Sequence, residues 1–189
     1  MRNGLFLLLA ALVIGLAAPD KASSGSDELR VEDDPGGGLH AAAVLTLPVP
    51  PAVVQAVLTD YERWPVLFGV QMRIGRIERR PDHVLTDLYI RHPILPGERR
   101  LMCENRVPPG GGLVTTLVEG DFRRYARTWR LAEDGDPGRT KARFNLVVDV
   151  KTLAPDWMVS IELQRQLEKH FRILREMAAE QAARQAAGK

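Results

Sequence analysis

The residues of this sequence that could do metal or acid–base chemistry are scattered rather than grouped. The four histidines, His40, His83, His92 and His170, fall in four different predicted elements. No two of them have the spacing that places two metal ligands on one face of a helix or strand, and the single cysteine, Cys103, makes a zinc site improbable. The pattern predicts no metal site and no cofactor.

Cys103 and His170 are the strongest single candidates for a reactive group. Cys103 follows Leu101 and Met102, which is typical of a small core residue, and no local signature places a histidine or asparagine to activate its thiol. His170 lies at the edge of an apolar helical stripe, so it is either a boundary histidine of the core or a catalytic base. Residues 110–112 are three glycines without the lysine and serine or threonine of a phosphate loop, and they predict a hairpin turn. No catalytic residue is therefore predicted.

An unusually basic predicted strand, residues 122–131, is the other feature that could contribute to function. It contains Arg123, Arg124, Arg127 and Arg130. Such a face is either solvated and salt-bridged or a contact for anionic lipid headgroups. The sequence leaves both interpretations open.

The side of the sheet on which Arg127 lies depends on one local irregularity. Tyr125, Arg127, Trp129 and Leu131 occupy alternate positions, and Trp129 and Leu131 are natural core residues. Strict alternation turns Tyr125 and Arg127 inward too, where an arginine needs a carboxylate or a polar ligand group. A β-bulge after Asp121 would instead return Arg127 to the surface.

The beginning of the chain predicts export. A short basic start, Met-Arg-Asn, precedes a continuous apolar segment at residues 5–18, which is shorter than the roughly 20 residues of a transmembrane helix. Such a segment matches the hydrophobic region of a signal peptide, and Gly15 and Ala17 are small residues at the positions that a signal peptidase reads. We expect a signal peptide at residues 1–17 and a periplasmic or secreted mature protein. An uncleaved membrane anchor is the alternative.

Length and charge restrict the possible partners only slightly. The chain has 189 residues, with 26 Lys and Arg against 24 Asp and Glu, which fits one domain with a substantial core and favours no charged partner. It has no aromatic RNA-binding motif, no zinc spacing and no basic tract, so no nucleic-acid partner is predicted.

The elements that must position these residues begin after a polar lead-in. Residues 18–38 are rich in Asp, Ser, Gly and Pro without an apolar period, and we expect them to be flexible. Apolar residues then alternate over Leu39–Leu47, which predicts a strand, and two prolines favour a short helix at residues 51–59. Turn signals divide residues 70–150 into about six further strands.

After Pro155 the apolar period becomes helical. Apolar residues recur every third or fourth position from Val159 to Met177, and a helix over residues 156–183 would be roughly 40 Å long. An antiparallel meander hides one of its faces, and this helix is the only predicted element long enough to cover that face. A gap between a curved sheet and a helix is a common site for an apolar ligand.

Several short motifs accompany this order of elements. They are VLTDYERWP at residues 57–65, EGDF at 119–122, Trp129, and Gly-Arg-Thr at 138–140. Together the motifs and the order of elements resemble the START-like superfamily, and the similarity is closest to its polyketide cyclase/dehydrase-type and coenzyme Q-binding branch, often labelled SRPBCC. The resemblance extends over about residues 38–182, with a START-like domain expected at residues 39–184.

The resemblance implies an α+β helix-grip fold that binds hydrophobic molecules. A curved antiparallel sheet of about seven strands would wrap around the C-terminal helix, with two short helices after the first strand. The aromatic elbow at residues 61–68 would then either face a ligand at the cavity mouth or plug the end of the sheet. The implied cavity residues are Tyr61, Trp64, Phe68, Met72, Tyr125, Arg127, Trp129, Phe144, Leu163, Leu167 and Phe171.

Three functions are compatible with these observations. The first is an exported binding or carrier protein for a hydrophobic ligand such as a lipid, isoprenoid or quinone, with transient membrane-surface contact. The second is a cyclase- or dehydratase-like enzyme, which needs a convergent acid–base pair in the same cavity. The third is an interaction module without a pocket. The absence of a strong catalytic constellation and the predicted export favour the first.

Overall fold

The computed structural model describes residues 28–92 and 97–188. The predicted signal peptide, residues 1–17, lies outside the described residues. The elements, in chain order, are β1 (Arg30–Asp33), β2 (Leu39–Leu47), α1 (Pro51–Leu58), the 3-10 helix η1 (Tyr61–Arg63), α2 (Trp64–Phe68), β3 (Gln71–Arg79), β4 (Val84–Arg91), β5 (Glu98–Arg106), β6 (Leu113–Gly120), β7 (Phe122–Glu133), β8 (Thr140–Val150) and α3 (Asp156–Ala187).

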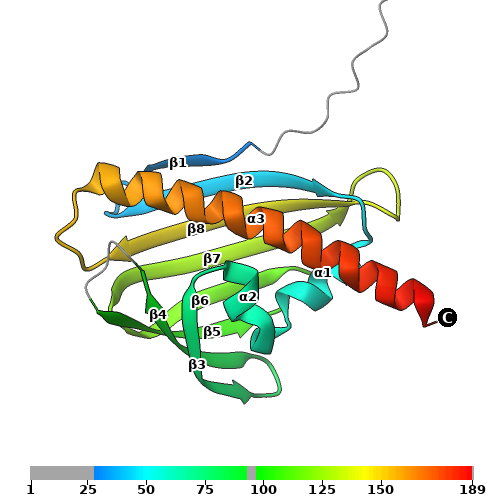
Figure 1. The fold of residues 1–189 in the computed structure, drawn as a ribbon, viewed down its shortest axis with the longest axis horizontal. Helices are drawn as coiled ribbons and strands as arrows, with labels where there is room; N and C mark the ends of the chain where they lie inside the picture. Colours follow the sequence, from blue (N-terminus) through cyan, green and yellow to red (C-terminus); the bar gives the residue numbers. More distant parts are fainter. Residues whose placement is uncertain (1–27, 93–96, 189) are drawn as a thin grey trace, which may run out of the picture.

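The strands form one antiparallel sheet in the order β1-β2-β8-β7-β6-β5-β4-β3. Strands β3 to β8 follow one another as a meander. Strand β2 lies beside β8, the last strand of this meander, and pairs with it. The sheet curves, and α3 lies along it, as Figure 1 shows. The predicted helix-grip fold is confirmed.

The sheet has one strand more than the expected seven, because β1 lies within the segment predicted to be flexible. Strand β1 pairs with β2 through its main chain, with Val31 opposite Ala41. Its side chains are largely exposed, and only Val31 of the strand packs against the core. An edge strand that is held by main-chain hydrogen bonds needs no alternating apolar side chains. The sequence pattern therefore did not predict β1.

The aromatic elbow at residues 61–68 consists of η1 and α2, which follow directly after α1. Pro65 lies in the first turn of α2, where a backbone N–H has no partner within the helix, so the lack of an N–H in proline costs nothing there. Pro65 therefore favours the start of α2 as well as the end of the preceding helical segment. Gly69 ends α2 at a φ of 60°, a left-handed conformation suited to glycine. The indole Nε1 of Trp64 donates a hydrogen bond to the Leu58 carbonyl oxygen at 3.1 Å, which ties α2 to α1.

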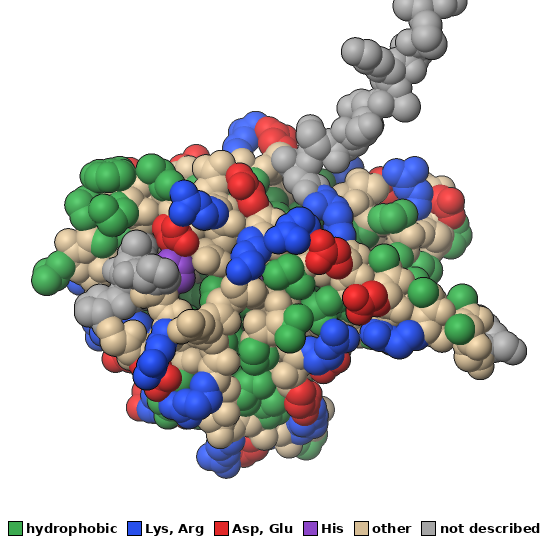
Figure 2. All heavy atoms as spheres, in the orientation of Figure 1, with side chains coloured by type: hydrophobic (Ala, Val, Ile, Leu, Met, Phe, Trp, Pro, Cys, Tyr) green, Lys and Arg blue, Asp and Glu red, His purple; other side chains and the backbone are tan. Residues whose placement is uncertain are grey.

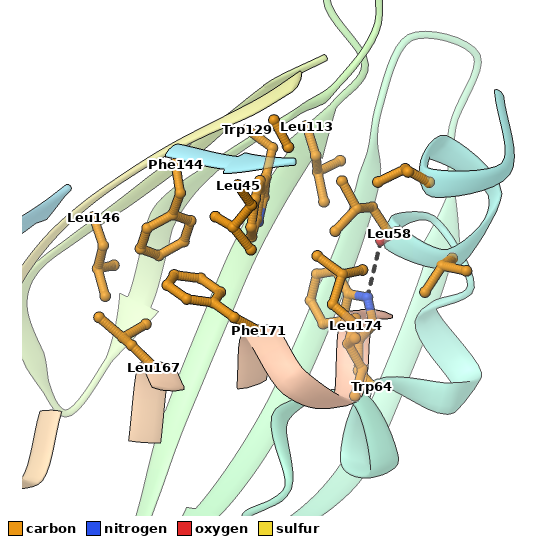
Figure 3. Close-up of a cluster of buried hydrophobic side chains, with 14 of the residues drawn as sticks. Leu45, Leu58, Trp64, Leu113, Trp129, Phe144, Leu146, Leu167, Phe171 and Leu174 are labelled. Atoms are coloured by element: carbon orange, nitrogen blue, oxygen red, sulfur yellow. Dashed lines mark hydrogen bonds between the residues drawn. The ribbon is translucent and has the colours of Figure 1, made fainter. Parts of the chain in front are cut away.

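Helix α3 packs its apolar stripe onto the inner face of the sheet. Leu167, Phe171 and Leu174 are buried. The ring of Phe171 lies 5.8 Å from that of Trp129 and 5.2 Å from that of Phe144, and Figure 3 shows these rings meeting between sheet and helix. In the described parts of the chain, no helix is long and apolar enough to cross a membrane.

A β-bulge in β7 lies between Phe122 and Arg124. From Tyr125 onward the pairing with β8 is regular, with Arg127 opposite Leu146 and Trp129 opposite Phe144. The bulge lies before Tyr125, so it does not change the side on which Arg127 points. Only 3% of Arg127 is exposed, and the structure therefore places it on the inner face.

Candidate functional site

A cavity of about 190 Å³ lies between the inner face of the sheet and α3. Strands β3 to β8 form one wall, and α2 and α3 form the other. The wall is mostly apolar, because alternate residues of each strand turn inward. Of the residues predicted to line a cavity, those found in the wall are Trp64, Phe68, Met72, Tyr125, Arg127, Phe144, Leu163 and Leu167.

Tyr61, Trp129 and Phe171 were predicted in the wall but lie in the packed core beside it. Trp129 is fully buried against Phe144 and Phe171, so other rings occupy the space that a ligand would need. Tyr61 packs on Trp64, with ring centroids 4.9 Å apart. Inward direction alone therefore does not make a residue part of the cavity.

The two ends of the cavity differ in burial. Trp64, Arg127 and His170 are at most 3% exposed and form its inner end. Val159 and Leu163, near the start of α3, are only partly buried and form its outer end. Trp64 thus closes one end of the cavity and also lines it, so the two interpretations of the elbow do not exclude each other.

Arg127 is a permanent positive charge at the inner end. Its Nη2 donates a hydrogen bond to Thr115 Oγ1 at 3.2 Å, and its buried Nε has no partner among the described residues. The guanidinium carbon lies 4.9 Å from the ring centroid of Trp64 and 4.7 Å from that of Phe68. No carboxylate in the described parts of the chain forms an ion pair with it.

A buried chain of hydrogen bonds holds Thr115 in place beside Arg127. Thr115 Oγ1 donates to Asn105 Oδ1 at 2.9 Å, which leaves its oxygen lone pairs to accept from Arg127. Asn105 Nδ2 in turn donates to Thr86 Oγ1 at 3.1 Å and to the Val84 carbonyl oxygen at 3.0 Å. The chain crosses β7, β6, β5 and β4, so the position of Arg127 is fixed by the sheet itself.

The sequence interpretation missed Thr115 as a wall residue. The signal was present, because Thr115 alternates with Leu113 and Leu117 and should therefore share their inward face. A threonine carries neither a charge nor an aromatic ring, so its type alone does not mark it as a ligand-facing residue. Other wall residues that it missed include His92, Cys103, Glu162, Gln166 and His170.

His170 lines the cavity and has one ring nitrogen without a partner among the described residues. Its Nδ1 lies 2.9 Å from the Leu67 carbonyl oxygen, so Nδ1 carries the hydrogen and donates it. Its buried Nε2 is then an acceptor, and it has no partner among the described residues. Burial lowers the pKa of His170 to about 4; the Leu67 hydrogen bond opposes this shift, and the charge of Arg127 adds to it. The ring stacks on Phe68 at 4.8 Å.

The other reactive groups of the wall are not set up for covalent chemistry. Burial raises the pKa of the Cys103 thiol to about 12, so it stays protonated and is not a nucleophile at neutral pH. Burial also raises the pKa of Tyr125. At the outer end, His92 Nε2 lies 3.2 Å from a carboxylate oxygen of Glu162. Within residues 28–92 and 97–188, no three potential metal ligands come together.

Comparison with solved structures identifies several proteins with the same fold. A protein from Thermus thermophilus is 19% identical, with a TM-score of 0.59, and the match covers 79% of this chain and 99% of that one. A START superfamily protein from Mycobacterium smegmatis is 18% identical, with a TM-score of 0.59 and coverage of 75% and 97%. The Zhui aromatase/cyclase from Streptomyces sp. R1128 is 14% identical, with a TM-score of 0.58 and coverage of 78% and 94%.

At these identities the structural matches show the fold alone. A search of curated proteins found no match. The family model described as polyketide cyclase / dehydrase and lipid transport matches residues 47–171, from the end of β2 to the middle of α3. That range is more than half of the chain and includes the elbow, the meander and the helix that covers it. The chain therefore belongs to the polyketide cyclase/dehydrase and lipid transport family.

Proposed function

We propose that this protein is an exported binding or carrier protein for a hydrophobic ligand, which it holds between the sheet and α3. The observation that supports this most strongly is the mostly apolar cavity of about 190 Å³, closed at one end and lined by six strands and two helices. Such a site excludes water from an apolar molecule. The basic start and short apolar segment at residues 1–18 support export.

The cavity also bears on the two alternative functions. A protein that acts only as an interaction module needs no internal cavity. Its interior should be filled with close-packed side chains, as protein cores are. A cyclase- or dehydratase-like enzyme needs a convergent acid–base pair in the cavity. The histidine–carboxylate pair of the described wall, His92 with Glu162, lies at the outer end, and the candidate base at the buried inner end is His170. A base with a pKa of about 4 has little driving force for abstracting a proton at neutral pH, so binding is the better-supported function.

The size of the cavity limits the ligand. Sites for drug-sized molecules are typically about 300–1,000 Å³, and this cavity of about 190 Å³ is smaller. A single acyl or isoprenoid chain, or a quinone ring, fits this size better than a lipid with two chains. A longer tail would leave through the outer end, between Val159 and Leu163.

One preparation tests both export and ligand binding. Protein purified from the exported fraction should have the intact mass of a chain that starts near Ala18, because a signal peptidase would remove the apolar segment. An organic extract of this protein should contain an apolar compound in near-stoichiometric amount. A full-length, membrane-bound species would contradict export. An empty extract, together with no binding of an apolar fluorescent probe at micromolar concentration, would contradict the carrier function.

An exposed apolar cluster lies beside the outer end of the cavity. The cluster consists of Leu153, Trp157, Met158 and Ile161, which are 101%, 63%, 37% and 54% exposed. Figure 2 shows hydrophobic side chains gathered at this end of the molecule, where α3 begins in Figure 1. We infer that this cluster makes the transient contact with a membrane surface, because ligand that leaves the outer end would pass beside it.

Three of the four arginines of β7 are engaged within the protein, so this strand does not offer a basic face to lipid headgroups. Arg130 alone is exposed without an ion pair among the described residues. Arg123 lies 3.0 Å from Asp149, and Arg124 lies 2.6 Å from Asp34, so both are salt-bridged. Arg127 points into the cavity instead. The membrane contact proposed here is therefore apolar.

Replacing two residues of the apolar cluster with glutamate should weaken the binding of the protein to lipid vesicles. The double substitution Trp157→Glu with Ile161→Glu should lower the vesicle-bound fraction by about tenfold or more, since burying each apolar side chain contributes about 1.5–3 kcal/mol. Co-sedimentation with lipid vesicles measures this. Val107→Glu is the matched control, because Val107 is 53% exposed and follows β5 at the hairpin end of that strand. Equal binding by both variants and the wild type would contradict the role of the cluster.

A further inference from the structure

Arg127 is a buried charge without a counter-charge. It is 3% exposed, and in the described parts of the chain its only hydrogen-bond partner is the neutral Thr115. Glu162 is the one carboxylate in the described cavity wall, and it contacts His92 and Arg165 at the outer end. The inner end is thus positive and the outer end carries the acidic group.

Such an arrangement does not stabilise the fold. Removing a charge from water is costly unless an opposite charge and a full set of hydrogen bonds replace the lost hydration. Trp64 and Phe68 offer their ring faces to the guanidinium, which compensates for part of that loss. The unpartnered Nε remains, on a side chain that lines the cavity.

The same arrangement suits the binding of an anion. The guanidinium is already desolvated in the folded protein, so a ligand anion needs to lose only its own hydration. Asn105, Thr86 and the Val84 carbonyl hold Thr115, and Thr115 holds Arg127, so the donor group is rigid before a ligand arrives. Charge-assisted hydrogen bonds from arginine to a carboxylate are among the strongest in proteins.

We propose that Arg127 is an anion subsite at the inner end of the cavity, and that the ligand is a single-chain amphiphile with a carboxylate head. The carboxylate binds Arg127, and the chain lies along the apolar wall toward Val159 and Leu163. Glu162 at the outer end disfavours the opposite orientation of the ligand, because that orientation would place the ligand carboxylate beside the carboxylate of Glu162. This inference rests on the proposed function, since it identifies the head group of the ligand in the same cavity.

The test compares two ligands of equal chain length, dodecanoate and dodecanol, at neutral pH. Displacement of a neutral apolar fluorescent probe from purified, ligand-stripped protein measures both affinities. The wild type should bind dodecanoate at least about tenfold more tightly than dodecanol, because a hydrogen bond to a charged group contributes about 1.5–3 kcal/mol. In Arg127→Met the preference should disappear or reverse, since the buried carboxylate then has no counter-charge.

Two further variants keep the test interpretable. Arg130→Met removes an arginine from the exposed face of the same strand, and it should keep the wild-type preference. Arg127→Lys keeps the charge without the planar fork, and it should keep part of the preference. The melting temperature of Arg127→Met should be no lower than that of the wild type, because the substitution removes an unpaired buried charge.

The outcomes separate this inference from the proposed function. Equal wild-type affinity for the two ligands overturns the anion subsite and leaves the carrier function standing. A preference for dodecanoate that survives in Arg127→Met overturns the assignment to Arg127. If neither ligand nor the neutral probe binds the wild type, the carrier function itself is wrong. If the methionine variant does not fold, the wild-type comparison and the lysine variant decide the question.

Discussion

Replacing Phe171 with alanine should lower the free energy of unfolding by about 3–5 kcal/mol. Phe171 is 2% exposed, and its ring packs edge-on against Trp129 and Phe144 at 5.8 and 5.2 Å. The alanine variant would leave a void between α3 and the sheet that these rigid rings cannot fill. Urea unfolding followed by circular dichroism measures the loss.

Ile161→Ala is the control for that experiment. Ile161 lies on the same helix but is 54% exposed, so its replacement should change the free energy of unfolding by no more than about 0.5 kcal/mol. If Phe171→Ala costs as little as this control, α3 does not pack on the sheet as described. Phe171 does not line the cavity, so the variant should report on packing rather than on ligand contact.

Between about pH 7.5 and pH 5 the wild type should lose roughly 2 kcal/mol of stability through His170 alone. Its pKa is lowered to about 4 in the folded protein by burial, against about 6.5 in the unfolded chain. Between these two values the unfolded chain binds a proton that the folded protein does not bind. Stability therefore rises with pH in this window, and it is lost as the pH falls from about 6.5 toward 4.

The measurement is the free energy of unfolding as a function of pH for the wild type and His170→Gln. The amide of glutamine can still donate a hydrogen bond to the Leu67 carbonyl oxygen, but it does not titrate. Carboxylates such as Asp34 and Asp82, whose pKa values are lowered by arginine partners, lose their contribution at lower pH in both proteins. They cancel in the comparison. Parallel curves for the two proteins would mean that His170 is not buried uncharged.

The sequence predicted the helix and the sheet because their signals are local and repeated. The apolar stripe of α3 persists over many turns, so its buried face follows from a period of 3.6 residues alone. The strands from β3 to β8 are separated by glycine- and proline-rich turns, which mark their ends. The family resemblance rests on the same order of elements, and for that reason it correctly indicated a helix-grip fold.

The resemblance was less reliable for the cavity than for the fold. It placed Trp129 and Phe171 in the wall along with Phe144, since all three are large and point inward. Which of them faces a space and which faces another ring depends on how side chains from β7, β8 and α3 divide the interior. That division is a property of packing between distant segments, and no periodicity along one segment encodes it.

What the sequence determined by itself is the type and order of the elements and the inward or outward alternation within each regular strand. Only the tertiary structure decided where the bulge of β7 lies, and with it that Arg127 points inward without a carboxylate beside it. The same holds for His170, whose low pKa depends on Leu67, a residue 103 positions earlier in the chain. Alternation and helical period arise from backbone geometry over a few residues, whereas the burial and partners of a charge arise from segments that only folding brings together.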